Sequence, residues 1–472
     1  MDRKRRRLVQ ALGAGSTLAL AGCGGGSSSS PTPVNTPTPN QPEVPDEPDA
    51  LPTASFLHGV ASGDPLSDRV ILWTRVTPDL GNGEDVAVAV TVASDPAMQQ
   101  IVATYAATAT AAADYCVKVD ASGLQADRWY YYQFAVANRT SAVGRTRTFP
   151  ASDRFIDRAR FAVVSCSNYP NGFFSVYRAV ANHPDLDFVL HLGDYIYEYG
   201  AGEYGDFPDR DPLPAHEMVS LSDYRQRHAQ YKTDQDLQAI HQQFPMIAVW
   251  DDHESSNDSY RDGAENHQPL TEGDWETRKQ IAQQAYFEWL PIRPREPGNH
   301  SVIYRRFQFG DLLDLTMLFA QLNIAELPSL SEDQAQLRGN LSAINMDQWD
   351  GYAADRLKIL NHIDDNNIDN VVILTGDIHT SWASEIYRNP GSLLGDLFDK
   401  PLAAELVTPA VTSPGFPEGA AEVAGVLIPV VNPHIRYVEA KSRGFILVDV
   451  DRQRTQGEFY YAQSIESFDL RG

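Results

Sequence analysis

Apolar residues follow two different patterns along the chain. Between residues 54 and 150 they form short runs, at 69–76, 86–93, 116–119, 129–136 and 146–149, which Gly, Pro and Asp separate. The run at 86–93 places a valine at alternate positions, which is typical of a strand with one buried face. Several short strands in succession predict a β-sandwich in this part of the chain.

From residue 160 onward, continuous apolar runs alternate with helical patterns. The runs open the segments 161–169, 188–200, 246–258 and 371–382, and helical patterns cover 173–183, 223–243, 274–289 and 355–366. Continuous Val/Ile/Leu runs are typical of parallel strands that are buried on both faces. Their alternation with helices predicts a layered α/β domain. Strand-like runs return near the C-terminus, at 405–411, 444–449 and 457–462.

Each of the four apolar runs in the α/β region stops at residues that can bind a metal ion. These residues are Cys166, Asn168, Asp194, Tyr197, Asp252, His253, Asp377 and His379. In open α/β sheets, ligands bind in the crevice beyond the carboxyl ends of the strands. A single Asp after a strand is often only a turn or a helix cap. Four such strand ends, with Cys and His among the residues, predict a two-metal hydrolase centre.

The residue types suggest different metals for the two positions. Asp194 is the natural bridging carboxylate, because it ends the cleanest strand and Gly193 lets the backbone turn there. Cys166 and Tyr197 offer a thiolate and a phenolate, which suit ferric iron. Two alternatives stay open: Tyr197 belongs to a tyrosine-rich loop and could simply pack there, and Cys166 could pair with Cys116 or remain an inert buried thiol.

The remaining candidates supply oxygen and nitrogen. Asn168, Asp252 and Asp377 are hard oxygen ligands, which suit calcium, magnesium or manganese. His379 is a borderline ligand for either position. His253 could instead contact the substrate or donate a proton to the leaving group.

The net charge narrows the range of partners. With 38 Lys and Arg against 63 Asp and Glu, the formal charge is −25, and the basic residues form no stripe beyond the N-terminus. Because nucleic-acid binding needs a basic footprint, no nucleic-acid-binding surface is expected. An acidic chain suits the binding of hard cations, although acidity also serves solubility alone.

The first 53 residues have the composition of a leader and a tether. Residues 1–23 join five basic residues to a short apolar stretch and Cys23, which indicates a signal peptide. Arg5 and Arg6 resemble a twin-arginine export signal, and residues 20–23 resemble a lipobox, in which Cys23 is lipidated. Residues 24–53 are rich in Gly, Ser, Pro and Thr, a composition that predicts a linker. We therefore expect export to the periplasm or cell surface, with membrane attachment only through Cys23.

The strand-end motifs resemble a known family. SCSN (165–168), GDYIYEYG (193–200), WDDHE (250–254) and GDIHTSW (376–382) are similar to those of the bacterial PhoD-type alkaline phosphatases. These belong to the calcineurin-like metallophosphoesterases and are related to purple acid phosphatases. Segments 58–76, 222–234, 349–356 and 432–445 carry the same resemblance outside the site.

The resemblance implies a fold and an activity. The expected fold is a four-layer αββα metallophosphoesterase domain, at 151–472, preceded by a β-sandwich at 54–150. In the sandwich, residues 124–134 resemble the corner and penultimate strand of fibronectin type III modules. The expected activity is hydrolysis of small-molecule or polymeric phosphomonoesters and phosphodiesters by a hydroxide bound at Fe3+ and Ca2+.

The resemblance also assigns roles residue by residue. Cys166 and Asn168 take the places of the first-motif Asp and His of the wider superfamily, and Asp194 bridges the two metals. Tyr197 binds iron, as in purple acid phosphatases. Asp252 replaces the superfamily's Asn beside His253, and Asp377 and His379 replace two His ligands.

One departure from the family pattern lies near residues 315–317, where a segment of the usual sequence is missing. Two other functions therefore stay open. The first is a phospholipase D-like phosphodiesterase on the same scaffold. The second is a surface lipoprotein that binds metal but is catalytically impaired, which the shortened region favours and the four intact motifs oppose.

Overall fold

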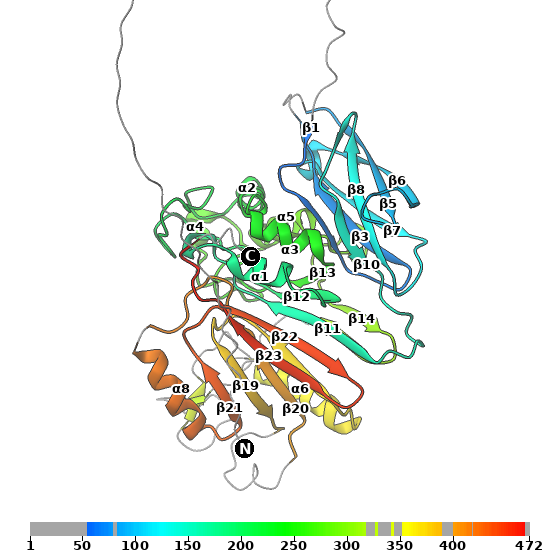
Figure 1. Ribbon diagram of the computed structural model, residues 1–472. Helices are drawn as coiled ribbons and strands as arrows, with labels where there is room; N and C mark the ends of the chain where they lie inside the picture. The colour runs from blue at the N-terminus through cyan, green and yellow to red at the C-terminus, as the bar shows by residue number, and fades with distance from the viewer. Residues whose placement is uncertain are drawn as a thin grey trace, which may run out of the picture. The chain divides into compact units, whose positions relative to one another are not determined.

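The computed structural model describes residues 54–78, 83–317, 326–328, 341–343, 352–388, 400–417 and 419–467 (Figure 1). The predicted signal peptide and linker lie outside the described residues, as do residues 318–325, which directly follow the predicted missing segment. Cys116 and Cys166 are both free and buried, so the disulfide between them does not form.

An eight-stranded sheet forms the centre of the fold. Its order is β23-β22-β11-β12-β13-β2-β3-β7. The bounds are β11 (Arg158–Val164), β12 (Phe188–Leu192), β13 (Met246–Val249), β22 (Gly444–Asp451), β23 (Thr455–Tyr461), β2 (Val60–Gly63), β3 (Arg69–Arg75) and β7 (Cys116–Ser122). As predicted, β11, β12 and β13 run parallel, so their carboxyl ends meet at one edge.

A second sheet faces the first. It contains β18 (Val371–Thr375), β20 (Ala403–Val407), β19 (Ser381–Ile386) and β21 (Ile435–Glu439), in that order. The two sheets approach closely, because a Cβ atom on Gly457 of β23 would lie only 2.5 Å from the Leu406 side chain of β20. The Thr408 hydroxyl, just after β20, donates to the Val163 carbonyl of β11 over 3.0 Å.

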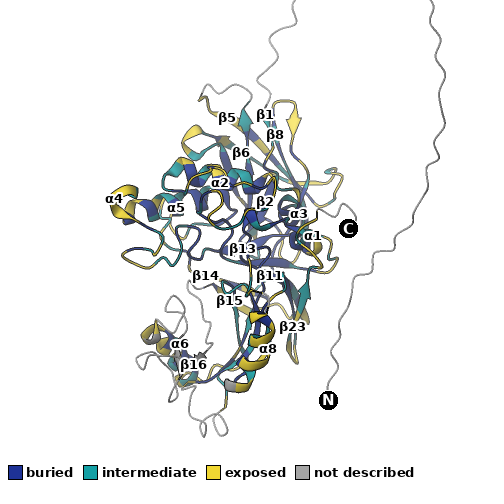
Figure 2. Ribbon diagram, turned by 90° about the vertical axis from the view of Figure 1, so that its left-hand side faces the viewer, coloured by how far each residue is buried: buried dark blue, intermediate teal, exposed yellow. Residues whose placement is uncertain are grey.

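Helices cover the outer faces of both sheets, which gives the predicted αββα layers (Figures 1 and 2). The helices on the large sheet's side are α1 (Ser175–Ala181), α2 (Leu221–Lys232), α3 (Gln235–Gln243), the short α4 (Pro269–Glu272) and α5 (Trp275–Trp289). On the small sheet's side lie α6 (Ala353–Asp365) and α8 (Ala420–Val431). Among the described helices, none is long and apolar enough to cross a bilayer.

The single helix predicted over 223–243 is wrong in one respect, because the structure divides it into α2 and α3. Asp234 lies between them and accepts the backbone N–H groups of Asp236 and Leu237 at 2.9 and 3.2 Å. An Asp that caps a new helix in this way ends the preceding one, and the chain changes direction.

The predicted β-sandwich forms, and it shares the eight-stranded sheet with the αββα layers. Its other sheet contains β10 (Gly144–Arg147), β8 (Trp129–Val136), β5 (Val86–Ala93) and β6 (Ile101–Ala109), with β9 (Arg139–Thr140) paired to β8. The core between the sheets includes Leu72, Val90 and Tyr132. The Tyr130 hydroxyl accepts the Gln125 N–H at 2.9 Å, as in a tyrosine corner.

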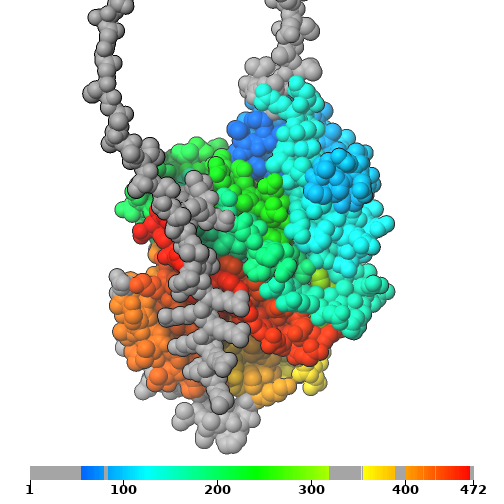
Figure 3. Space-filling view, viewed as in Figure 1, coloured from blue at the N-terminus to red at the C-terminus, as the bar shows by residue number. Residues whose placement is uncertain are grey.

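Short two-stranded pairs complete the described elements. They are β1 (Ala54–Ser55) with β4 (Thr77–Pro78), β14 (Arg305–Phe309) with β15 (Leu313–Met317), and β16 (Glu326–Pro328) with β17 (Leu341–Ala343). In the space-filling view, the red C-terminal strands cross the visible face between the green helices and the orange and yellow segments (Figure 3).

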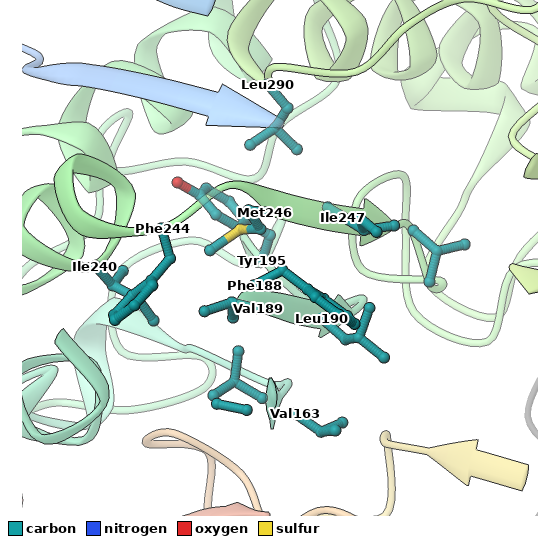
Figure 4. Close-up of a cluster of buried hydrophobic side chains, with 14 of the residues drawn as sticks. Val163, Phe188, Val189, Leu190, Tyr195, Ile240, Phe244, Met246, Ile247 and Leu290 are labelled. Atoms are coloured by element: carbon teal, nitrogen blue, oxygen red, sulfur yellow. The ribbon is translucent and has the colours of Figure 1, made fainter. Parts of the chain in front are cut away.

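The main hydrophobic core holds the three parallel strands in place (Figure 4). Leu190 of β12 and Ile247 of β13 are fully buried, and Ile240 and Phe244 cover them from α3 and the residue that follows it. Close packing of this kind resists displacement. The strand ends therefore form a rigid support for the polar residues beyond them.

Candidate metal centre

The backbone at the strand ends adopts a conformation that side chains seldom allow. The φ angle is +60° at Cys166, +52° at Asp194, +68° at Asp377 and +59° at His379. A residue with a Cβ atom is uncommon in this left-handed region, and such strain is concentrated at functional sites. Four of the eight predicted site residues are therefore held at an energetic cost that the surrounding fold has to offset.

Three of the predicted residues form the first group of potential ligands. The Cys166 thiol, an Asp194 oxygen and a His379 nitrogen all lie within 4.8 Å of one another. Tyr197 joins them, because its hydroxyl donates to Asp194 Oδ2 at 2.9 Å and lies 3.2 Å from His379 Nε2. The Ser413 hydroxyl donates to the Tyr197 oxygen at 2.7 Å. A thiol, a phenol, an imidazole and a carboxylate thus converge on one point.

The orientation of His379 is compatible with metal binding. Its Nδ1 lies 2.9 Å from the Pro414 carbonyl oxygen, which requires a proton on Nδ1 and leaves the lone pair on Nε2. Burial lowers the pKa of His379 to about 3, so the ring is neutral at neutral pH. A ligating His commonly donates its other N–H to a carbonyl in this way.

Asp194 belongs to two groups, as a bridging residue requires. Its carboxylate also lies within 4.8 Å of ligand atoms on Asp252 and His253. Burial, followed by the nearby Asp252 and Glu254 carboxylates, raises the pKa of Asp194 well above its usual range, although His253 opposes this. Among the residues that the structure describes, its buried Oδ1 atom has no hydrogen-bond partner. A buried carboxylate oxygen without a partner is costly unless a cation binds it, so this residue fits a metal ion.

A third group contains a residue that the sequence motifs did not single out. Asp251, Asp252 and Asp377 bring carboxylate oxygens within 4.8 Å of one another. Burial and the neighbouring Asp194 and Asp252 raise the pKa of Asp251. Three crowded carboxylates fit a hard divalent cation such as calcium. The sequence did carry a signal, because WDDHE offers two adjacent carboxylates after the strand, but the family resemblance assigns a role only to the second.

Asn168 is buried beside the first group, and other contacts occupy its amide. The amide nitrogen donates to Asn171 Oδ1 at 2.5 Å and to the Tyr204 carbonyl at 2.8 Å. Its oxygen accepts from the Tyr231 hydroxyl at 3.4 Å. Because an amide oxygen has a second lone pair, these contacts fix its orientation and leave room for one further interaction.

His253 is held by a buried carboxylate. Its Nδ1 lies 2.8 Å from Oε2 of Glu198, whose other oxygen accepts from Asn257 N–H and the Asn266 amide at 2.8 and 2.9 Å. Although burial opposes it, the carboxylates of Asp252, Glu198 and Asp194 raise the pKa of His253 well above its usual range. The imidazole is therefore suited to act as an acid.

Glu254 connects two of the strand ends, and the sequence did not predict this role. Its carboxylate accepts the backbone N–H groups of Asp194, Tyr195 and Asp251 at 3.1, 2.6 and 2.7 Å. Burial raises the pKa of Glu254 to about 7. The WDDHE motif includes this glutamate, but it does not show that two of the three partners lie in a turn some sixty positions earlier in the chain.

Fold and site together define a phosphoric ester hydrolase of the metallophosphoesterase type. The family model for the PhoD-like phosphatase matches residues 161–320 and 319–459, and that for its N-terminal domain matches 43–150. The chain therefore belongs to the PhoD-like phosphatase family.

Two known proteins show the extent of the similarity. The chain is 33% identical over 470 residues to "Alkaline phosphatase D" of Bacillus subtilis (strain 168), covering 86% of this chain and 77% of that protein. It also matches a solved structure titled "Structure of PhoD" with a TM-score of 0.77 and 31% identity, covering 89% of this chain and 88% of that one. The two stretches of the catalytic family match meet at residues 319–320.

Proposed function

We propose that the protein is an exported alkaline phosphatase D that hydrolyses phosphomonoesters and phosphodiesters at an iron–calcium centre. The observation that carries this proposal is the overlap of the three ligand groups. Asp194 belongs to the first and second groups, and Asp252 to the second and third. Overlapping groups of this kind suit two neighbouring metal ions, which is the arrangement that phosphoryl transfer uses.

The ligand types support a division between the two metals. Fe3+ would be held by Cys166, Asp194, Tyr197 and His379, where the sulfur and phenol donors lie. Ca2+ would be held by Asp194 and by the oxygen ligands Asn168, Asp252 and Asp377, with Asp251 beside them. When bound, the two ions supply an activated water and neutralise charge on the phosphoryl oxygens.

The chain's own residues contribute a proton donor. Because Nδ1 of His253 is directed at Glu198, Nε2 is the nitrogen available to a substrate. His253 would donate the Nε2 proton to the leaving alcohol oxygen, and Glu198 would stabilise the imidazolium before transfer. General acid catalysis of this kind contributes roughly 10²–10⁴-fold in rate.

Export and attachment form the second part of the proposal. Residues 1–23 would direct twin-arginine export, Cys23 would carry a lipid anchor, and residues 24–53 would tether the body, comprising a sandwich domain at 54–150 and a catalytic domain at 151–472. A globomycin-sensitive shift in the mobility of the full chain, lost in Cys23→Ala, would support lipidation. An unshifted chain in the soluble periplasmic fraction would contradict it.

The activity is tested by turnover of p-nitrophenyl phosphate and bis(p-nitrophenyl) phosphate at alkaline pH. We expect EGTA to stop turnover without removing iron, and calcium to restore it. Asp194→Ala should abolish turnover and lower the bound metal measured by mass spectrometry. Restoration by zinc but not by calcium would overturn the calcium assignment, and wild-type turnover in Asp194→Ala would overturn the bridging role.

A further inference from the structure

A cavity of about 730 Å³ opens beside the proposed calcium ligands. Asp251 and Asp252 form one part of its wall, and the loop after them, α5, residues 301–304 and the start of α6 form the rest. Ligand pockets typically have volumes of about 300–1,000 Å³. The cavity is therefore far larger than one phosphoryl group requires, and it has room for an organic substituent.

Five aromatic side chains belong to the cavity wall, and three of them are exposed. Tyr260, Tyr304 and Tyr352 line the cavity with 52%, 51% and 39% of their surface exposed. Trp250 and the fully buried Tyr286 lie deeper, with ring centroids 5.6 Å apart. The Tyr286 hydroxyl is buried without a hydrogen-bond partner among the described residues. The exposed tyrosine faces are suited to stacking with a planar ring.

Hydrogen bonds hold one part of the cavity wall, the loop that contains Tyr260. The Tyr260 N–H donates to the Gly263 carbonyl at 2.8 Å, and the Trp275 indole N–H donates to the Tyr260 carbonyl at 3.3 Å. Lys279 of α5 donates to the Arg261 carbonyl at 3.2 Å. These contacts attach the loop to α5, so little ordering would be needed on binding.

A phosphodiester carries a leaving alcohol and an alcohol that stays attached to phosphorus, and the position of the cavity indicates which of the two it can bind. His253 does not line it, nor do its neighbours Glu198 and Tyr197. Because His253 is the proposed contact of the leaving alcohol and does not line the cavity, that alcohol would lie outside the cavity. The cavity is then placed for the alcohol that stays attached to phosphorus.

The charge around the cavity limits what this alcohol can carry. Five acidic residues line it, whereas its basic residues are Arg261 and Lys279. Lys279 is already paired with Glu276 at 2.6 Å. Additional phosphate groups on the ligand would meet few basic side chains on this wall, which disfavours nucleotides with further phosphates and polyanionic chains.

We propose that the aromatic cavity beside Asp251 and Asp252 binds the retained alcohol of a phosphodiester, and that it selects an uncharged, ring-bearing alcohol such as a nucleoside. This inference rests on the proposed phosphodiesterase function and adds the substrate class to it. Tyr260 and Tyr304 would then determine specificity, without taking part in the chemical step.

The test uses two diesters with the same leaving group. Thymidine 5′-(p-nitrophenyl phosphate) and methyl p-nitrophenyl phosphate both release p-nitrophenol, and they differ only in the retained alcohol. We expect kcat/KM for the thymidine ester to exceed that for the methyl ester by at least about tenfold, because stacking of one base contributes roughly 1–3 kcal/mol. The advantage should lie in KM, and free thymidine should compete with the thymidine ester.

Substitutions separate the cavity from the catalytic centre. Tyr304→Ala and Tyr260→Ala should each lower the ratio of the two kcat/KM values roughly tenfold, and should abolish competition by thymidine. Tyr437→Ala removes a tyrosine with 38% exposure outside the cavity and should leave the ratio unchanged. Equal turnover of the two esters, or an unchanged ratio in both cavity variants, would overturn the inference. Failure to hydrolyse either ester would overturn the proposed function instead.

Discussion

The Nδ1 atom of His253 lies 2.8 Å from Oε2 of Glu198, in a setting where the Glu198 carboxylate is fully buried. Although burial opposes ionisation, His253 and the donors Asn266 and Asn257 lower the pKa of Glu198 to about 2. The pair therefore combines an ionised carboxylate with a readily protonated imidazole. This is the arrangement that a general acid needs in an enzyme that works at alkaline pH.

Replacement of Glu198 should impair the acid without removing it. In Glu198→Gln, the imidazole loses a charge that raises its pKa, so the alkaline limb of the pH–kcat profile should move to lower pH. We expect kcat to fall roughly tenfold or more for phenyl phosphate, since its leaving group needs a proton, and less for p-nitrophenyl phosphate. Steady-state kinetics across pH 7–11 measures both effects.

Glu265→Gln provides a matched control for that variant. Glu265 accepts from the Asn257 side chain at 3.0 Å and does not contact His253. The pH–kcat profile of Glu265→Gln should be that of the parent protein. An identical profile in Glu198→Gln, with the same loss for both substrates, would show that the glutamate only supports the fold.

Binding of Fe3+ by Cys166 and Tyr197 should be detectable in the visible absorption spectrum. Burial raises the pKa of both groups well above their usual ranges, so neither ionises without a cation. With Fe3+ bound, both should be deprotonated and give a charge-transfer absorption. We expect Tyr197→Phe to shift or bleach the band, and Tyr204→Phe, which removes a neighbouring tyrosine, to keep it. A colourless, iron-free and fully active protein would contradict the assignment.

Asp251 should contribute to calcium binding although the family resemblance assigned the role to Asp252. Loss of one of three crowded carboxylates weakens the attraction for a dication. We expect Asp251→Asn to raise the calcium concentration for half-maximal activity about tenfold or more, with iron content unchanged. Titration of EGTA-treated protein with calcium measures this. If Asp252→Asn alone changes the calcium requirement, Asp251 is not a ligand.

The sequence predicted where the strands that carry the candidate ligands end. It did not predict which other residues contact these strand ends. Continuous apolar runs mark β11, β12 and β13, because strands that are buried on both faces favour Val, Ile and Leu. The run of β18 has the same composition, although four of its five residues are only partly buried. By contrast, the contact of Glu254 with the Asp194 turn depends on a backbone at φ +52°. The hydrophobic pattern of a sequence does not determine a backbone angle of this kind. Residues whose contacts depend on such an angle therefore cannot be predicted from the pattern.

The sequence also did not predict that strands of the sandwich and strands of the α/β region belong to one sheet. The N-terminal runs correctly predicted strands, but not that β2 pairs with β13 through the single register pair Gly63 and Met246. This contact joins segments about 180 positions apart. It depends on the absence of a side chain at Gly63, and a glycine in a strand can equally mark a bulge or a tight bend.

Gly63 should accordingly tolerate no side chain. A Cβ atom there would lie 2.5 Å from both the Met246 and the Pro291 carbonyl oxygens. Because both are backbone atoms, neither can turn aside, and β2 has to move away from β13. We expect Gly63→Ala to lower the free energy of unfolding by about 1–3 kcal/mol, which urea denaturation would detect. Met246 begins the strand that leads to Asp252, so calcium affinity should fall as well.

Gly425→Ala is the matched control, because the one contact that its Cβ would make with the described residues is the Val438 carbonyl oxygen, at 3.6 Å. Since Gly425 lies within α8, alanine there should raise helix stability by roughly 0.5–1 kcal/mol. If Gly63→Ala unfolds at the parent's urea concentration, the junction between the sandwich and the central sheet is not as tightly packed as its geometry indicates.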